Sequence, residues 1–457
     1  MENVLQFINS NRETYIEELK DFLRIQSISS DPEKKPEMQK AAEFLMSKFN
    51  GMGFENVKIL NPESGHPVVY AEKIVDSKKP TILFYGHYDV QPVDPIELWT
   101  SPPFEPEIRD GKIWARGATD DKGQLYTHLK SVEAFLKSGT ELPVNLKFII
   151  EGEEEIGSPS LPKVIQSNKD LLKCDAVVIS DTSMYDEKTP SITYSLRGLA
   201  YFQIEITGPN RDLHSGTFGG AVMNPIQALC DLLSGMKDKN GKITIPGFYD
   251  DVLPLTKKER DGFKRLKFNE KAYMKELGVK ELFGEKGYTT LERTWARPTL
   301  EINGIWGGYT GVGAKTVLPS KAYAKISMRL VPNQTPKKVE KLLKDYLKKA
   351  VPKSVTYKLE TLHGGEPAIT PIDNKAIQIA AQSMKLAFGK EPVFIREGGS
   401  IPIVVEFSRT LKAPVVLMGF GLSTENLHSP NEHFDLNNFH RGILCSAYFI
   451  NEFSKVK

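Results

Sequence analysis

Hydrophobic residues in the first part of this chain fall into short unbroken runs that alternate with longer segments of helical periodicity. A short apolar run bounded by turn residues is typical of a strand buried in a parallel sheet. Apolar residues that recur every three or four positions are typical of a helix with one face on a core. The alternation therefore predicts an α/β layer with a largely parallel sheet flanked by helices. The expected strands are 57–60, 68–71, 81–85, 144–150 and 176–180, and the expected helices are 14–25, 36–50 and 123–138.

The pattern changes near Arg197. Strict alternation of apolar and polar residues over 199–207 and 322–330 predicts half-exposed strands of the antiparallel kind. An amphipathic helix is expected at 335–350, whereas 255–295 is dense in Lys and Glu and is expected to be a solvated insertion. Alternating strands with amphipathic helices predict an α+β sandwich that forms a separate domain.

The buried α/β pattern returns after position 366, with helices expected at 373–388 and 436–454 and strands at 393–395 and 415–418. The chain is therefore expected to leave one domain, build a second, and come back to the first. The predicted domains are 1–196 together with 367–457, interrupted by an inserted domain over 197–366.

Composition and charge argue against a nucleic-acid-binding, membrane-spanning or disulfide-rich protein. The 457 residues are 40% hydrophobic, which is enough for sizeable cores, and the net charge of +2 gives no reason to expect nucleic acid or an anionic membrane as a partner. We see no apolar stretch of the ~20 residues that a membrane span needs, and no signal-peptide pattern at the N-terminus. The three cysteines are far apart and odd in number, so no disulfide framework is expected. These features predict a soluble cytoplasmic protein.

Most of the histidine and acidic residues that could bind a metal ion come directly after predicted strands. Parallel strands place ligands at their carboxyl ends, and imidazole with carboxylate favours ions such as zinc or manganese. Each motif alone has a simpler interpretation: a strand end can be followed by an ordinary polar turn, and three successive acids can form a solvated face. Here the acids follow a buried strand, where like charges repel unless a cation compensates them. The candidate side chains are His87, Asp89, Asp120, Glu154, Glu155, Asp181 and His428.

Sequence motifs for other kinds of active site are weaker than the metal-ligand pattern. The segment GYTGVGAKT at 308–316 is one residue too long between glycine and lysine for a phosphate-binding loop, and the chain lacks a GxSxG nucleophile elbow. His128 shares the apolar face of its predicted helix and is expected to be a packing residue.

Six motifs together carry a resemblance to a known family. They are GHYDVQP at 86–92, ARGATDDKG at 115–123, EGEEEIGS at 151–158, ISD at 179–181, RDLHSG at 211–216 and LHSPNE at 427–432. In this order and spacing the chain resembles the aminoacylase/carnosinase family of co-catalytic metallopeptidases. The segments WTSPPFEP at 99–106, RLVPN at 329–333 and REGGSIP at 396–402 make it most similar to the cytosolic, carnosinase-like dipeptidase branch.

The resemblance implies a centre with two divalent ions per subunit, zinc or manganese, in a catalytic domain interrupted by a lid domain. It implies that Asp120 bridges the ions and that its peptide bond to Asp121 is cis. Asp89 would orient an imidazole ligand, and Glu154 would be the general base. The remaining ligands would be His87 with Asp181 on one ion, and Glu155 with His428 on the other.

The same resemblance implies residues outside the metal centre. His214 would reach the active site of the partner subunit in a homodimer formed through the lid, and Arg329 and Ser400 would lie at the carboxylate end of the substrate. A planar guanidinium suits a carboxylate because it can bind both oxygens, although Arg329 could also be a strand residue paired to a nearby acid.

The expected function is hydrolysis of dipeptides or short peptides with a free C-terminal carboxylate, by a hydroxide that bridges the two metals while Glu154 acts as base. The same centre would serve an N-acyl-amino-acid deacylase of the aminoacylase or desuccinylase type, which stays the alternative. A binding protein that kept the fold without catalysis is a third possibility, but the residues expected for the base and the bridging acid are both present.

Overall fold

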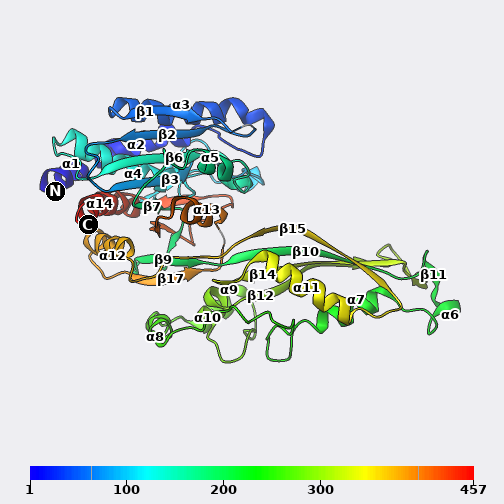
Figure 1. Cartoon of the computed structure of the whole chain (residues 1–457). Coiled ribbons are helices and arrows are strands. Elements are labelled where there is room, and N and C mark those ends of the chain that lie inside the picture. The colour runs from blue at the N-terminus through cyan, green and yellow to red at the C-terminus, as the bar shows by residue number, and fades with distance from the viewer. Residues whose placement is uncertain (63, 400, 457) are drawn as a thin grey trace. The chain divides into compact units, whose positions relative to one another are not determined.

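The computed structural model describes residues 1–62, 64–399 and 401–456, and the chain in it divides into two compact units (Figure 1). The first unit comprises Met1–Tyr194, Thr370–Ile395 and Ile403–Lys457. The second comprises Ser195–Ile369 and Arg396–Pro402. The domain boundaries given above, and the roles of catalytic domain and lid, stay predictions.

The first unit is organised around a sheet in which the central strands are parallel. Strand β3 pairs in parallel with β6 and with β7, and β7 pairs in parallel with β18. The strands outside this centre, β1 with β2 and β2 with β6, pair antiparallel, as β9 does with β18. The prediction of a mainly parallel sheet with flanking helices is therefore confirmed. The order is β1 (Glu55–Leu60), β2 (Val68–Lys73), β6 (Asn145–Glu151), β3 (Thr81–His87), β7 (Ala176–Ile179), β18 (Val415–Leu417) and β9 (Ser191–Leu196), and β17 (Val393–Glu397) also pairs with β9. The last two residues of β9 belong to the second unit, as does β16 (Ala368–Ile369), which pairs with them.

Helices cover this sheet with apolar faces. Helix α4 (Lys122–Lys137) packs on β3 and is almost wholly buried, because α1 (Glu2–Ser10), α2 (Arg12–Leu23) and α14 (Leu436–Phe453) contact it from other sides. Helix α3 (Lys35–Gly51) packs on β1 and β2, and α12 (Lys375–Phe388) packs on α14 (Figure 1). His128 of α4 is fully buried and stacks on Phe84, as expected of a packing residue.

The second unit contains an antiparallel sheet in the order β12 (Thr299–Gly307), β14 (Lys321–Leu330), β10 (Gly198–Thr207) and β15 (Thr356–Gly365). Helices α7 (Pro225–Ser234) and α11 (Pro336–Ala350) pack on β10 (Figure 1). Burial alternates along β10 and β14, as the sequence predicted. Strands β12 and β15 were not predicted, since both expose most of their residues and a bulge at Ile302/Gly304 interrupts the period of β12.

The solvated insertion contains short helices, as expected: α8 (Lys257–Arg265), α9 (Glu270–Leu277) and α10 (Thr290–Ala296). Thr256 and Thr289 each form a capping box at the start of α8 and α10. The other helices and strands are short: α5 (Leu161–Ser167), α6 (Ser215–Phe218), α13 (Pro402–Leu411), β4 (Glu107–Arg109), β5 (Lys112–Trp114), β8 (Ser183–Met184), β11 (Leu213–His214), β13 (Val317–Leu318), β19 (Gly421–Leu422) and β20 (His433–Asp435).

Cys174, Cys230 and Cys445 are all free thiols. Among the residues that the structure describes, no helix has both the length and the apolar character needed to cross a membrane.

Candidate metal centre

The parallel strands bring their carboxyl ends to one edge of the sheet. Tyr85 of β3 pairs with Ile149 of β6 and with Ile179 of β7, so the residues that follow these three positions emerge together. These are His87 at the end of β3, Glu154 and Glu155 just after β6, and Asp181 just after β7. Loops add Asp120, immediately before α4, and His428, shortly before β20.

The side chains form two groups of potential metal ligands among the described residues, and Asp120 belongs to both. In the first group, His87 Nε2 lies 3.2 Å from Asp120 Oδ1 and 3.8 Å from Asp181 Oδ2. In the second, His428 Nε2 lies 3.0 Å from Asp120 Oδ2 and 3.3 Å from Glu155 Oε2. The two oxygens of one carboxylate therefore face different imidazoles, which is the arrangement that a bridging ligand requires. The peptide bond between Asp120 and Asp121 is cis, as the resemblance implied.

The backbone of Asp89 determines which ring nitrogen of His87 is available to a metal ion. Its Nδ1 lies 3.1 Å from the backbone oxygen of Asp89, which can only accept a hydrogen bond. Nδ1 must therefore carry a hydrogen, so Nε2, which faces Asp120 and Asp181, is the ring nitrogen left to bind a metal ion. A metal ion at Nε2 would take the place of the hydrogen that this nitrogen otherwise shares with Asp120.

The carboxylate of Asp89 has a second task that the sequence did not reveal. It is fully buried, with Oδ1 3.4 Å from His87 Nδ1. Its Oδ1 also accepts a hydrogen bond from the backbone N–H of Glu154 at 3.2 Å, and its Oδ2 accepts one from Glu155 at 3.1 Å. One carboxylate thus holds a candidate ligand from each group and the candidate base.

The acids of this cluster compete for protons. Burial, and next the charge of Asp120, raises the pKa of Asp181 to about 7 and also raises the pKa of Glu155. Burial, followed by the charge of Asp181, raises the pKa of Glu154 well above its ordinary value. Hydrogen bonds with Asp120 and then Glu155 raise the pKa of His428 to about 10. So many buried acids favour a bound cation, because a cation stabilises the carboxylates in their charged form.

Chemically, the donor set fits divalent transition metals. Each group offers one imidazole nitrogen and carboxylate oxygens, the ligands that zinc and manganese accept. One donor near Glu155 went unnoticed in the sequence: Gln91 Nε2 donates a hydrogen bond to Glu155 Oε2 at 2.7 Å. Gln91 lies two residues after Asp89, and this closeness to a candidate site residue could have drawn attention to it in the sequence.

The residues expected at the substrate lie in the second unit or outside the described residues. His214 is exposed at the end of β11, and its Nδ1 accepts a hydrogen bond from the backbone N–H of Gly216 at 3.1 Å. Arg329 is half-buried on β14, and burial lowers its pKa. Ser400 lies outside the described residues.

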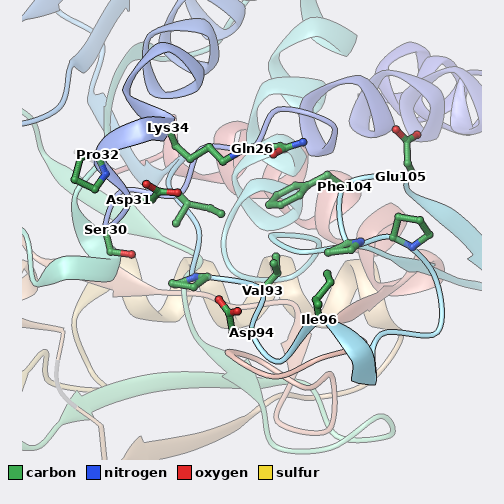
Figure 2. A pocket seen from close by; sticks show the side chains of 14 residues that line it. Gln26, Ser30, Asp31, Pro32, Lys34, Val93, Asp94, Ile96, Phe104 and Glu105 are labelled. Atoms are coloured by element: carbon green, nitrogen blue, oxygen red, sulfur yellow. Dashed lines mark hydrogen bonds between the residues drawn. The ribbon is translucent and has the colours of Figure 1, made fainter.

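A separate cavity of about 730 Å³ lies in the first unit, and Figure 2 shows the side chains that line it. None of the predicted ligands lines it. Its wall is joined to the segment that leads to Asp120, since the backbone oxygen of Pro92, one of the lining residues, accepts a hydrogen bond from Arg116. The lining comes from segments 26–34 and 92–105.

Comparison with known proteins agrees with this geometry. The pattern of Peptidase family M20/M25/M40 matches residues 83–452. The chain is 34% identical to the Cys-Gly metallodipeptidase dug1 of Schizosaccharomyces pombe, covering 100% of this chain and 99% of that protein. It is also 34% identical to the Beta-Ala-His dipeptidase of Homo sapiens, over 100% of this chain and 93% of that protein.

Solved structures give the same result. An M20 family metallo-carboxypeptidase from Sulfolobus solfataricus matches with a TM-score of 0.83 at 35% identity, over 97% of this chain and 99% of that one. Human carnosine dipeptidase 1 matches with a TM-score of 0.80 at 33% identity, over 100% and 99% of the two chains. The chain therefore belongs to Peptidase family M20/M25/M40, and it is a metallopeptidase. The resemblance to the carnosinase-like branch is confirmed.

Proposed function

We propose that this chain is a dipeptidase that binds two divalent ions, zinc or manganese, and hydrolyses dipeptides or short peptides with a free C-terminal carboxylate. The observation that carries the proposal is the pair of ligand groups that share Asp120. One ion would be held by His87, Asp120 and Asp181, and the other by Asp120, Glu155 and His428. Bound divalent ions supply a Lewis acid and an acidified water molecule at such a site.

The protein's own contribution to the reaction is proton transfer and positioning. Glu154 would accept the proton of the attacking water at its carboxylate and pass it to the nitrogen of the leaving amine. Its backbone is held by Asp89, the same residue that lies beside the His87 ring, so the base and a ligand share one support. Burial and then the charge of Asp181 raise the pKa of Glu154, and bound cations would lower it by neutralising the neighbouring acids.

The relatives support a dipeptide as substrate, since they include a Cys-Gly metallodipeptidase and a Beta-Ala-His dipeptidase. We infer that Arg329 and Ser400 bind the C-terminal carboxylate, and that His214 acts in the active site of the partner subunit of a homodimer formed through residues 197–366. N-acyl-amino-acid deacylation requires the same attack on an amide and is less favoured, because these relatives are dipeptidases. The cytoplasm is the proposed location.

A substrate panel tests this function. We expect metal-loaded protein to cleave dipeptides, and to cleave matched dipeptides with an amidated C-terminus and N-acetylated amino acids far more slowly. Chelation should abolish cleavage, and zinc or manganese should restore it. Faster cleavage of N-acetylated amino acids than of any dipeptide would favour the deacylase, and full activity after exhaustive chelation would refute the metal-dependent reaction.

A further inference from the structure

Glu432 is a buried carboxylate that accepts four hydrogen bonds. Its Oε1 accepts from the backbone N–H groups of Thr119 at 3.0 Å and Asp120 at 3.1 Å. Its Oε2 accepts from the backbone N–H of Gly117 at 2.9 Å and from Arg116 Nη1 at 2.8 Å. The residue is 0% exposed. The backbone from 117 to 120 therefore forms a cradle of N–H groups around one anion, as in the anion-binding nests of other proteins.

The cradle has a shape that depends on glycine. Gly117 adopts a φ of +80°, and a Cβ atom there would lie 2.7 Å from Val90 Cγ1. A side chain at this position would be strained and would collide with the loop that follows β3. The local sequence thus allows the backbone to close tightly around the carboxylate.

Glu432 connects two of the three segments that supply the second ligand group. Its oxygen binds the backbone N–H of Asp120, whose side chain faces both imidazoles. It also lies four positions after His428 on the same loop. The Glu432 side chain therefore joins the loop of His428 to the backbone of Asp120.

The position of the His428 side chain depends on contacts made by its loop. Its side chain is 56% exposed, so packing around the ring contributes little to its position. Its loop also holds residues with positive φ: Asn426 at 58°, His428 itself at 59° and Asn431 at 62°. A loop in this conformation keeps its shape only if the surrounding structure determines it.

We propose that Glu432 is a positioning residue that sets the place of the Asp120 carboxylate relative to His428, and so determines how tightly the second ligand group holds a metal ion. The inference rests on the proposed two-metal function. Glu432 acts through the backbone N–H of Asp120, and nothing in its contacts makes it a ligand or a base.

Arg116 neutralises Glu432 and anchors the assembly. Its side chain is 1% exposed, with Nη2 donating to the backbone oxygen of Pro92 at 2.9 Å and the guanidinium 5.3 Å from the ring of Trp99. Removing one charge of a buried pair leaves the other uncompensated, whereas removing both avoids that penalty. This difference separates a role in stability from a role in positioning.

Three variants test the proposal: Glu432→Gln, the double variant Arg116→Met with Glu432→Gln, and Glu425→Gln as a matched control. Glu425 is about equally buried, and it accepts hydrogen bonds from the backbone N–H groups of Leu422 and Asp435. It also accepts one from the hydroxyl of Thr119, but none from the backbone N–H groups at 117–120 that bind Glu432, so it controls for loss of those backbone bonds. Zinc and manganese affinities of each full-length variant are measured by calorimetry, and the stability of the metal-free protein by denaturant unfolding.

We expect Glu432→Gln to lower both stability and metal affinity, because an amide has one acceptor oxygen and turns its NH₂ toward backbone donors. Loss of a residue that supports a ligand typically weakens metal binding about 10–100-fold. The double variant should regain stability but not affinity, and kcat should fall more than KM rises. Glu425→Gln should lose stability while its metal affinity stays within about threefold of wild type.

Each other outcome counts against the proposal. If Glu432→Gln binds metal as wild type does, or if the double variant regains affinity together with stability, Glu432 is structural only. Should Glu432→Gln not fold, the double variant carries the test, and wild-type affinity in it overturns the inference. Wild-type protein that binds neither metal overturns the two-metal function itself, which distinguishes that failure from the failure of Glu432 as a positioning residue.

Discussion

Asp89→Asn tests whether one buried carboxylate supports both halves of the metal centre. The Asp89 oxygens accept hydrogen bonds from the backbone N–H groups of Glu154 and Glu155, and Oδ1 also lies 3.4 Å from His87 Nδ1. An asparagine has the same shape but only one acceptor oxygen. Whichever way its amide is turned, the NH₂ group faces one of the two backbone N–H donors.

The expected magnitude follows from these contacts. A hydrogen bond to a charged group contributes about 1.5–3 kcal/mol, and each 1.4 kcal/mol corresponds to about a tenfold change in affinity. Losing one such bond at a site with 0% exposure should therefore weaken metal binding roughly 10–100-fold. Turnover should fall as well, because the backbone of Glu154 loses part of its support.

Metal affinity is measured by calorimetric titration of metal-free protein with zinc and with manganese, and kcat by dipeptide hydrolysis at saturating metal. Asp175→Asn is the control for a change of carboxylate to amide away from the site: Asp175 is exposed, and its Oδ2 accepts a hydrogen bond from the backbone N–H of Thr81 at 2.7 Å, at the end of β3 opposite His87. The control should bind metal as wild type does. A folded Asp89→Asn variant whose metal affinity lies within about threefold of wild type would refute the reasoning.

Four further predictions each concern a single side chain: Glu154, His214, Arg329 and Glu18. Glu154→Gln should keep its metal and lose about 10²–10⁴-fold in kcat, measured at saturating metal, and a loss below tenfold would exclude it as the base. Mixing inactive His214→Ala with inactive Glu154→Gln subunits should restore part of the activity if His214 works across a dimer, and a mixture with no activity contradicts this. Arg329→Met should raise KM for dipeptides about tenfold or more, with little effect on amidated analogues, whereas an equal effect on both would remove its role at the carboxylate. Burial opposes the charged form of Glu18, but hydrogen bonds led by Lys130 lower its pKa from 4.5 to about 2. Because the pKa is lowered on folding, Glu18→Gln should cost about 3 kcal/mol at pH 7, and the difference from wild type should vanish as pH falls from about 4.5 to about 2 in denaturant titrations. A difference that stays constant across that range would contradict the ion pair.

The sequence predicted most of the strands and helices of the first unit because buried strands and amphipathic helices have recognisable patterns of apolar residues. The run that forms β3 is apolar on both faces, and the apolar positions of α3 recur with the helical period. It did not predict β12 or β15, where exposure and a bulge remove the alternation on which such predictions depend. Neither strand has a buried face whose residues would stand out in the sequence.

The sequence by itself determined which side chains stand at the ends of the parallel strands. His87 and Asp181 were expected at the same edge because both follow runs predicted to be strands of a parallel sheet, and the direction of a parallel strand decides where its last residue lies. The structure adds that β3 and β7 are neighbours. Position along the chain carried that information for these two residues because His87 is the last residue of β3 and Asp181 comes two residues after the end of β7.

Only the tertiary structure decided how these side chains combine. Asp120 and His428 are 308 positions apart, and nothing in the spacing shows that the two oxygens of Asp120 face different imidazoles. The supports are equally hidden: Asp89 reaches the backbone of Glu154, and Glu432 reaches that of Asp120. Backbone N–H groups are the same in every residue except proline, so the residue types of Glu154 and Asp120 do not show which carboxylate binds their N–H groups.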